Sequence, residues 1–414
     1  KREIPALSPT EVQEKAQIVY RLVITVLRKI ILSIFLFSYI ALAAKITAFV
    51  APDSSYEALE KFISDNDNFL IEVYTFDNYD IAKLLQNKNF TLIVDEAPAG
   101  GMSDDEKFIL CALNKNNIFL YQSKYYMHAK YAVSGSKVLV ATENFGYHGF
   151  PDGYGNRGYG AIVEDENIAK DFSNIFNEDM KKSKKFVCDA TYKISEREKK
   201  IYQKKFDIEE FSGTAKSVFA PDAVDDIIGF INTSKNRLYI AQLYIHKEWG
   251  TKKEPKPNML LEAAIDKARQ GIEVKILLDS SFFNIDEDGK SNADTVNYVN
   301  DIAKKENINL QARLIDLNKL NLDELHGKLI ISDNSVLVSS INWGENSPTN
   351  NREAGVIIYG DAANYFSQVF LYDWNPGNNA ITGKAAEDRT TLVITIVIIV
   401  IIVLIILFIR YRRK

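Results

Sequence analysis

Cysteine and histidine are both scarce in this chain of 414 residues, which contains two cysteines and four histidines. Cys111 and Cys188 allow at most one disulfide, and no cluster of cysteine and histidine has the spacing of a zinc site. Outside the cytoplasm the two cysteines could pair, but two buried free thiols fit the sequence equally well. We therefore expect neither a metal ion nor another cofactor.

An excess of positive charge is also absent from the middle of the chain. The formal net charge is −5, yet residues 1–45 carry seven Lys/Arg against three Glu, and residues 410–414 carry four Lys/Arg, which leaves about −13 between them. Proteins that bind duplex nucleic acid are normally basic over the contact surface. The charge argues against a duplex substrate, but not against a short single strand or a lipid headgroup bound only at the site.

Two of the four histidines occur in a motif that is present twice. In both copies a lysine follows the histidine by two residues and an asparagine follows it by sixteen: His128, Lys130 and Asn144, and His326, Lys328 and Asn342. With only four histidines in the chain, this coincidence is not a product of chance. Because alternate residues of a strand share a face, His and Lys are expected to point the same way from a β-strand.

These residue types suit the cleavage of a phosphodiester. One imidazole can attack phosphorus and form a phosphohistidine, while a second protonates the leaving alcohol and then activates water or an acceptor alcohol. Two lysines and two asparagine amides can hold the non-bridging oxygens as charge shifts. Such a site needs no metal, and an isolated H-x-K would have been read as a surface histidine.

The duplicated motif resembles the phospholipase D superfamily, whose members build one phosphodiesterase site from two HxK motifs. The resemblance implies that Asp333 supports its own lobe, and Gly135 stands at the corresponding position of the first copy. It also implies that Glu353 hydrogen-bonds the histidine of the opposite lobe, whereas its counterpart is Gly158. Glu353 would then orient His128, which makes His128 the expected nucleophile and His326 the general acid.

Other polar residues near the motifs are expected to give supporting hydrogen bonds. Glu72 and Gln242 are predicted to occupy equivalent strand positions, and Thr142 and Ser340 lie two residues before the two asparagines.

The motifs fix the register of a longer repeat, which begins with Ala-Pro-Asp at residues 51–53 and 220–222. Strands alternating with helices predict an α/β fold: two homologous phospholipase D-like lobes with a mixed sheet flanked by helices and pseudo-twofold symmetry. The helices are expected at 56–63, 81–85, 223–231 and 259–269, and the strands at 69–74, 90–94, 131–133, 138–140, 239–244, 272–278, 329–331 and 336–338. The lobes span 46–180 and 214–378, and the Lys- and Glu-rich stretch 181–213 is expected to be a helical connector.

The two ends of the chain are predicted to meet a membrane. Residues 392–409 are an apolar run without a charge, long enough at about 1.5 Å per residue to span a hydrocarbon core, and the basic residues 410–414 follow them. A linker at 379–391 precedes this run. Within the basic N-terminal region 1–45, residues 30–44 are a signal peptide or an uncleaved anchor. Basic flanks favour cytoplasmic ends, so the lobes are expected outside the cytoplasm.

Three functions remain open. The leading one is a membrane-anchored phosphodiesterase that acts on phospholipid by hydrolysis or headgroup transfer. The second is an extracytoplasmic nuclease for single-stranded nucleic acid, and the third is a pseudoenzyme that binds phosphate, which Gly135 and Gly158 keep open. Lipid and nucleic acid present the same phosphodiester, so the sequence does not choose between them.

Overall fold

The computed structural model describes residues 25, 29 and 43–376, apart from 114–116, 190, 196–199 and 282–290. Within these ranges, none of the helices has the length and the apolar character needed to span a bilayer. Residues 30–42 of the expected N-terminal segment and the expected C-terminal span at 392–409 lie outside the described residues, so both stay predictions. The described residues from Ala43 to Trp374 belong to one compact unit.

The first lobe alternates strands with helices, as the sequence predicts. Its elements are β1 (Ala44–Ala51), α2 (Ser55–Ser64), β2 (Asn68–Val73), α3 (Tyr79–Leu85), β3 (Asn89–Asp95), α4 (Asp104–Ala112), β4 (Asn117–Tyr121), β5 (Lys130–Ser134), β6 (Lys137–Ala141), β7 (Gly158–Glu164), α5 (Glu166–Met180) and β8 (Ser183–Lys185). The expected helices at 56–63 and 81–85 correspond to α2 and α3, and the expected strands to β2, β3, β5 and β6.

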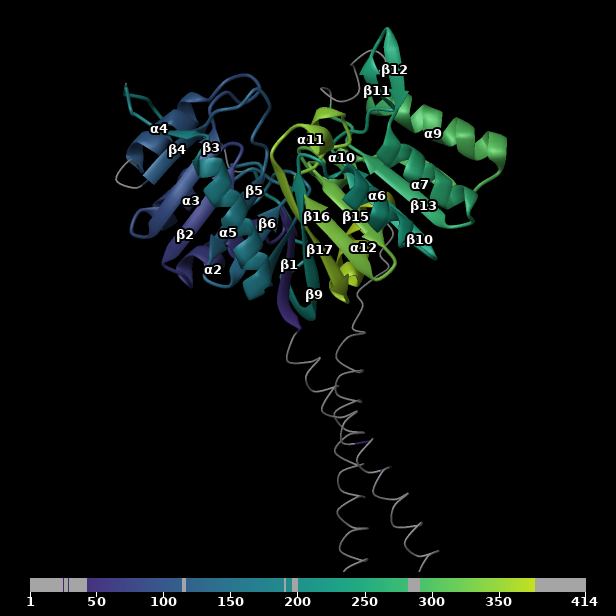
Figure 1. The fold of residues 1–414 in the computed structure, drawn as a ribbon, viewed down its shortest axis with the longest axis horizontal. Coiled ribbons are helices and arrows are strands. Elements are labelled where there is room, and N and C mark those ends of the chain that lie inside the picture. Colours follow the sequence, from purple (N-terminus) through teal and green to yellow (C-terminus); the bar gives the residue numbers. More distant parts are fainter. Residues whose placement is uncertain are drawn as a thin grey trace, which may run out of the picture. The chain divides into compact units, whose positions relative to one another are not determined.

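The second lobe repeats this order and adds a hairpin. Its elements are β9 (Glu209–Ala220), α6 (Val224–Asn232), β10 (Arg237–Gln242), β11 (Glu248–Thr251), β12 (Glu254–Pro257), α7 (Met259–Arg269), β13 (Glu273–Leu278), α9 (Asn292–Glu306), β14 (Leu310–Leu314), α10 (Leu317–Leu320), β15 (Lys328–Ser332), β16 (Ser335–Ser339), α11 (Asn346–Thr349), β17 (Glu353–Gly360) and α12 (Ala362–Trp374). The β11–β12 hairpin projects from the lobe beside α9 (Figure 1).

A single mixed sheet of 15 strands runs through both lobes in the order β14-β13-β10-β15-β16-β17-β9-β1-β7-β6-β5-β2-β3-β4-β8. At its centre β1 pairs with β9 in antiparallel register, from Ala44 opposite Gly213 to Ala48 opposite Glu209 (Figure 1). Outward from this pair the strands of the two lobes follow in the same sequence. The repeated order gives the pseudo-twofold arrangement that the duplicated motif predicts. The lobe limits themselves stay predictions, and both β1 and β9 begin a few residues before them.

Three apolar cores fill the space between the sheet and the helices. One lies under α2, α3 and α4 of the first lobe and includes Phe62, and a second lies under α6, α7 and α9 of the second lobe and includes Leu261. The third is shared by both lobes, because Phe172 of α5 and Phe370 of α12 belong to the same cluster. Neither lobe therefore has a complete core of its own.

The sequence of α5 shows why this helix packs on the sheet. Ile168, Phe172 and Phe176 recur every fourth residue and are buried, so they form an apolar stripe along one face. The helix begins where the Asp165 side chain accepts hydrogen bonds from the backbone N–H groups of Asn167 and Ile168, at 2.8 and 3.1 Å.

Two arginines form ion pairs between the lobes; Arg157 is fully buried, and the side chain of Arg352 is 11% exposed. Nε of Arg157 in the first lobe lies 2.9 Å from Asp373 at the end of α12, and its Nη1 lies 2.5 Å from Asp53. Reciprocally, Nε of Arg352 in the second lobe lies 2.6 Å from Asp179 at the end of α5. Burial raises the pKa of Asp373 to about 6 although Arg157 opposes the shift. Each C-terminal helix end is thus fixed to the opposite lobe by an ion pair.

The repeated Ala-Pro-Asp motif supplies further partners for these arginines. Nη1 of Arg157 donates to the carbonyl of Ala51 at 2.8 Å, and Nη1 of Arg352 donates to the carbonyl of Ala220 at 2.6 Å. The aspartates of the motif differ, since Asp222 is exposed and has a φ of 71°. Both repeats use the alanine carbonyl as an acceptor for the arginine, and among the described residues only the first repeat also uses the aspartate carboxylate.

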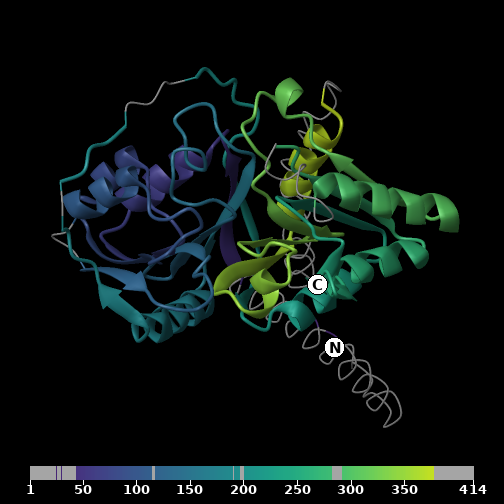
Figure 2. The ribbon, with the colours of Figure 1, turned by 90° about the horizontal axis from the view of Figure 1, so that it is seen from above.

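The connector is not helical, so that expectation was wrong. Its described residues form β8, extended segments and the start of β9, and in Figure 2 they run around the outside of the first lobe. The N–H groups of Lys205 and Phe206 donate to the Asp53 carboxylate, at 2.5 and 3.1 Å. These donors are satisfied by tertiary contacts instead of by a helical turn, which the Lys- and Glu-rich composition could not show.

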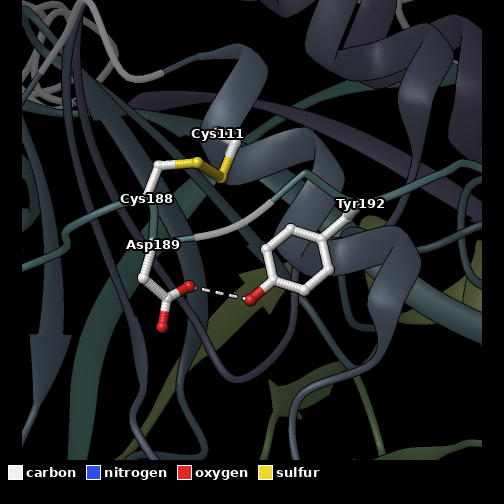
Figure 3. The surroundings of a disulfide bond; sticks show 4 residues. All are labelled: Cys111, Cys188, Asp189 and Tyr192. Atoms are coloured by element: carbon white, nitrogen blue, oxygen red, sulfur yellow. Dashed lines mark hydrogen bonds between the residues drawn. A yellow bond between two sulfur atoms is a disulfide. The ribbon is translucent and has the colours of Figure 1, made fainter.

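A disulfide between Cys111 and Cys188 joins the connector to helix α4 (Figure 3). Nearby, the Tyr192 hydroxyl donates to Asp189 at 2.8 Å, and the N–H of Ser195 donates to Asp105 at 2.7 Å. Of the two states that the sequence left open, the structure has the paired one. Such a bond suits an oxidising compartment.

We predict that this disulfide stabilises the fold. The bond closes a loop with a sequence separation of 77 residues, and disulfides typically stabilise a fold by roughly 2–4 kcal/mol. The double variant Cys111→Ser/Cys188→Ser should therefore unfold at a lower temperature than the wild type under oxidising conditions. In reductant the two proteins should converge. A wild-type melting temperature that does not respond to reductant would contradict the prediction.

Candidate active site

Each histidine motif begins at the boundary between the lobes. The N–H of His128 donates to the carbonyl of Arg352 at 2.7 Å, and the N–H of His326 donates to the carbonyl of Arg157 at 2.9 Å. The N–H of Arg352 in turn donates to the carbonyl of Tyr126 at 2.9 Å. Each motif is therefore aligned by the backbone of the opposite lobe, and both histidines lie at the lobe interface as the sequence predicts.

The two motif lysines are the first residues of β5 and β15, and both are fully buried. Nζ of Lys130 donates to the carbonyl of His128 at 2.5 Å, and Nζ of Lys328 donates to the carbonyl of His326 at 3.1 Å. Burial lowers the pKa of Lys130 well below its usual range and that of Lys328 to about 8. Each ammonium lacks a carboxylate in direct contact among the described residues, so an anion bound between the lobes would favour both charged forms.

His128 is held by the carboxylate that the resemblance assigns to it. Its Nδ1 lies 2.8 Å from Oε2 of Glu353, whose other oxygen accepts hydrogen bonds from Ser347 at 2.5 Å and Asn351 at 3.3 Å. Burial lowers the pKa of His128 to about 4, while Glu353 opposes the shift. Burial would raise the pKa of Glu353, but His128 and Lys130 hold it below its usual range. The imidazole is thus oriented and neutral at neutral pH.

His326 also has a carboxylate, and the sequence interpretation missed it. Oε2 of Glu143, in the first lobe, lies 3.2 Å from Nδ1 of His326 and accepts a hydrogen bond from Asn156 at 3.2 Å. Burial would raise the pKa of Glu143, but His326 and Lys328 lower it. The geometry of the His326 contact is that of an ion pair without hydrogen-bond alignment, so it is looser than the His128–Glu353 pair. His326 therefore has a carboxylate partner, although Gly158 stands where the second lobe has Glu353.

Two glycines of the first lobe leave room for the Glu143 side chain. Gly158 and Gly149 occupy the positions of Glu353 and Ser347 in the second lobe. A Cβ on Gly158 would lie 2.3 Å from Oε1 of Glu143, and a Cβ on Gly149 would lie 2.6 Å from its Cβ. In the second lobe the carboxylate that contacts a histidine comes from the start of a strand, whereas in the first lobe it comes from the residue before the motif asparagine. The two glycines leave the space that the Glu143 side chain occupies.

The two motif asparagines come from the loops after β6 and β16. Oδ1 of Asn144 and Oδ1 of Asn342 are buried, and neither has a hydrogen-bond partner among the described residues. The N–H of Asn342 donates to Ser347, the residue that also holds Glu353. Unpaired buried amide atoms are costly unless a ligand satisfies them, so both asparagines are suited to contact a substrate.

Thr142 and Ser340 accept hydrogen bonds from the backbone beside the two asparagine loops. Oγ1 of Thr142 accepts from the N–H of Tyr159 at 3.0 Å, and Oγ of Ser340 accepts from the N–H of Ala354 at 3.0 Å. These bonds tie each asparagine loop to the strand that starts at Gly158 or Glu353.

A further supporting pair lies at the ends of β3 and β13 and was not predicted. Asp95 accepts a hydrogen bond from the N–H of Met127 at 2.6 Å, and Asp279 accepts one from the N–H of Leu325 at 2.7 Å. Each carboxylate therefore fixes the residue before a motif histidine. The sequence did contain a signal for this pair, because an Asp follows the apolar residues of the equivalent strand in both repeats.

Asp333 lies in the β15–β16 turn and not at the histidines. Its carboxylate accepts hydrogen bonds from the N–H groups of Lys235, Asn236 and Arg237, at 2.7, 3.0 and 3.0 Å. It supports its own lobe, as the resemblance implies. Gly135 stands at the same turn position with a φ of 59°, against 50° for Asp333. The shared requirement is a left-handed backbone, which glycine adopts readily, so the first copy keeps its turn without the carboxylate.

Glu72 and Gln242 are not equivalent, which corrects the predicted alignment by one residue. In the sheet Glu72 stands opposite Tyr131, whereas Gln242 stands opposite Lys328. Residues opposite each other share a face, so Gln242 lies on the face of the motif lysine and Glu72 lies on the other face. There Oε2 of Glu72 accepts from the Tyr131 hydroxyl at 2.7 Å. A one-residue slip in a strand exchanges the faces.

Metal ligation is not a feature of these residues. Within the part of the chain that the structure describes, no group of three or more His, Cys, Asp or Glu side chains is placed to hold a metal ion. The expectation of a metal-free site remains a prediction about the reaction.

Comparisons with known proteins agree with this architecture. A family model described as "Cardiolipin synthase, PLD-like domain" matches residues 227–374, and no curated protein sequence matches the chain. Phosphatidylserine synthase from Haemophilus influenzae Rd KW20 superimposes with a TM-score of 0.54 at 13% identity, over 78% of this chain and 84% of that one. Polyphosphate kinase from Porphyromonas gingivalis gives 0.50 at 11% identity, over 80% and 50%.

A third structure, the phospholipase D family member Nuc from Salmonella typhimurium, has 20% identity over 41% of this chain and 99% of that one, with a TM-score of only 0.30. The first two structures show a shared fold, and the family model covers most of the lobe that carries the complete motif. With the motif present in both lobes of this fold, the chain belongs to the phospholipase D superfamily.

Proposed function

We propose that this protein is a metal-independent phosphodiesterase that acts on phospholipid through a phosphohistidine, by hydrolysis or headgroup transfer. The observation that carries the proposal is reciprocal: each lobe supplies the carboxylate that contacts the histidine of the other, Glu353 to His128 and Glu143 to His326. A pseudoenzyme would have no need for two such pairs around two buried lysines.

In the proposed first step, neutral His128 attacks phosphorus through Nε2, and the bond from phosphorus to the headgroup oxygen breaks. Protonated His326 gives its proton to that oxygen, so the alcohol leaves neutral. Burial lowers the pKa of His326, and Lys328 and Lys130 add to this effect. A bound phosphodiester anion offsets the lysine charges and so favours the protonated form that the step needs.

In the second step, water or an acceptor alcohol gives a proton to His326 while its oxygen attacks phosphorus. The bond from phosphorus to His128 breaks, which returns both histidines to their starting states. Lys130, Lys328 and the two asparagine amides hold the non-bridging oxygens throughout. We assign the nucleophile to His128 because its carboxylate contact is the shorter and the better aligned of the two.

Phospholipid is favoured over long nucleic acid by charge, and over short single strands by setting. The part of the chain between the basic ends carries about −13, which repels an extended polyanion. The matching family model is named for an enzyme of lipid synthesis. We also propose that the apolar ends anchor the protein with its lobes outside the cytoplasm, where the disulfide is stable. A tether raises the effective concentration of the site near lipid.

The direct test is turnover by the full chain of phospholipid vesicles and of single-stranded oligonucleotides, with EDTA present. We expect release of the lipid headgroup, unaffected by the chelator. Turnover of oligonucleotides alone would establish the nuclease instead. Activity that is lost in EDTA and restored by a divalent ion would contradict the metal-free mechanism.

Unequal roles for the histidines predict different phosphoenzyme behaviour with an activated aryl phosphodiester, whose leaving group needs no proton. His128→Asn should abolish acid-labile phosphate on the protein. His326→Asn and Glu143→Gln should still allow labelling, and Glu353→Gln should give a rate between wild type and the His128 variant. Label on His326 in the His128 variant, formed at the wild-type rate, would reverse the assignment.

The pH profile provides an independent check on Glu353. The carboxylate favours the imidazolium form of His128, so its removal lowers the pKa of His128 further. For the aryl diester, the fall in kcat/KM at low pH should therefore begin at lower pH in Glu353→Gln than in the wild type, by about one unit. The maximal rate should fall at the same time. An acid limb that moves to higher pH would mean that Glu353 does not act on the nucleophile.

A further inference from the structure

A hollow of about 420 Å³ opens beside His326. Besides this histidine, its lining includes four carboxylates, Asp77, Glu143, Asp323 and Glu324. We call it the acidic hollow. It adjoins the residue that the proposed function makes the general acid, so it lies where the leaving alcohol would be.

The pseudo-twofold symmetry places a second hollow of about 270 Å³ on the other side of the site. Tyr126 lines it and stands two residues before His128, as Glu324 stands two residues before His326. We call it the aromatic hollow, since Tyr244, His246 and Trp249 also line it.

The strand register extends this equivalence. Tyr74 N donates to the carbonyl between His128 and Lys130, and Leu243 N donates to the carbonyl between His326 and Lys328. Thr75 and Asp77 of the acidic hollow are therefore the counterparts of Tyr244 and His246. Rings in one hollow replace a carboxylate and a hydroxyl in the other, so the site distinguishes the two sides of a phosphodiester. The aromatic hollow also includes Glu248 and Glu345, and Glu345 accepts a hydrogen bond from Gly250 N at 2.9 Å.

Two carboxylates of the acidic hollow have oxygen atoms without a hydrogen-bond partner among the described residues. The side chain of Glu324 makes no hydrogen bond or ion pair within the described part of the chain, and Oε1 of Glu143, a residue that is 3% exposed, has no hydrogen-bond partner there. Burial raises the pKa of Glu324 to about 8, with Asp279 adding to the shift and Lys328 opposing it. Asp323 is already engaged, with His148 at 2.6 Å. A cation near Glu324 would relieve this accumulation of negative charge.

The arrangement suits an organic cation. The carboxylates do not converge on a metal position, since no described group of three or more such side chains can hold an ion. A polyanion that extends into the hollow would add negative charge beside its four carboxylates, which is unfavourable. A primary ammonium instead offers three donors to separate acceptors. The site is then positive at Lys130 and Lys328 and negative beside them.

We propose that the acidic hollow binds the ammonium group of an amino-alcohol headgroup, so that the preferred substrate is a zwitterionic phospholipid with its phosphate at the two lysines. This inference rests on the proposed function and adds the headgroup class and the residues that select it. Glu324 and Asp77 are specificity residues, and Glu143 both positions His326 and faces the leaving alcohol.

The experiment compares the full chain on vesicles of phosphatidylethanolamine and of phosphatidylglycerol with the same acyl chains, and uses hydrolysis of an activated aryl phosphodiester as a common reference. We expect wild type to prefer the amine headgroup in kcat/KM. Glu324→Gln should reduce that preference by about tenfold, the effect of one charge-assisted hydrogen bond. The loss should appear mainly in KM, and aryl diester hydrolysis should change little. Asp77→Asn should act in the same direction.

Asp226→Asn is the matched control, because it removes one exposed carboxylate that pairs with Lys216 far along the chain from either motif. It should leave the headgroup ratio unchanged. Aryl diester turnover without an amine preference, or a ratio that Glu324→Gln does not alter, would overturn the inference while the phosphodiesterase assignment stands. Absence of turnover on every diester would remove the proposed function, and the inference with it.

Discussion

Reciprocal exchange between the lobes is the constraint on which the site depends. Arg157 and Arg352 each form an ion pair with the last turn of a helix in the opposite lobe, fully buried for Arg157 and largely buried for Arg352. Removal of one partner from a buried pair typically costs about 3–5 kcal/mol, because the remaining charge stays buried without compensation. The carbonyls of the same two arginines accept hydrogen bonds from the motif histidines. The ion pairs that hold the lobes together therefore also set the position of the imidazoles.

The two halves of the site are related by symmetry but are not identical. Glu353 comes from the start of a strand and is held by two side chains, whereas Glu143 comes from a loop and has one unpaired oxygen. A duplicated scaffold gives two histidines of the same type, and such differences in the surrounding carboxylates allow one to attack and the other to transfer protons. The division of labour in the proposed mechanism follows from these local contacts and not from the motif itself.

Much of this arrangement could be predicted from the sequence, because the HxK spacing is tied to strand geometry. A histidine and a lysine two residues apart share a face wherever the strand lies, and the buried strands beside them are apolar runs. Glu143 could not be found in this way, since it occupies the place of Ile341 in the other repeat. Its signal was indirect: two glycines, Gly149 and Gly158, where the second lobe has Ser347 and Glu353.

The errors have a common physical origin. Glu72 and Gln242 were aligned by similarity of residue type, but only the hydrogen-bond register decides which face a side chain occupies. The connector has the composition of a helix, yet its N–H groups are bound by Asp53, a partner about 150 residues earlier in the chain. Both depend on tertiary contacts, and local sequence carries little information about these.

The core shared by α5 and α12 has a consequence for how the chain is made. The first lobe leaves the ribosome before any residue of α12 exists, so Tyr159 of β7, whose ring lies 6.2 Å from that of Phe366 in α12, lacks this partner during that interval. Apolar surface exposed in this way promotes aggregation until the missing half is synthesised. The completed lobes must then pack together to finish this shared core, so the unfolding of one lobe exposes apolar surface of the other. A protein that looks like two domains in sequence should thus behave as one during folding.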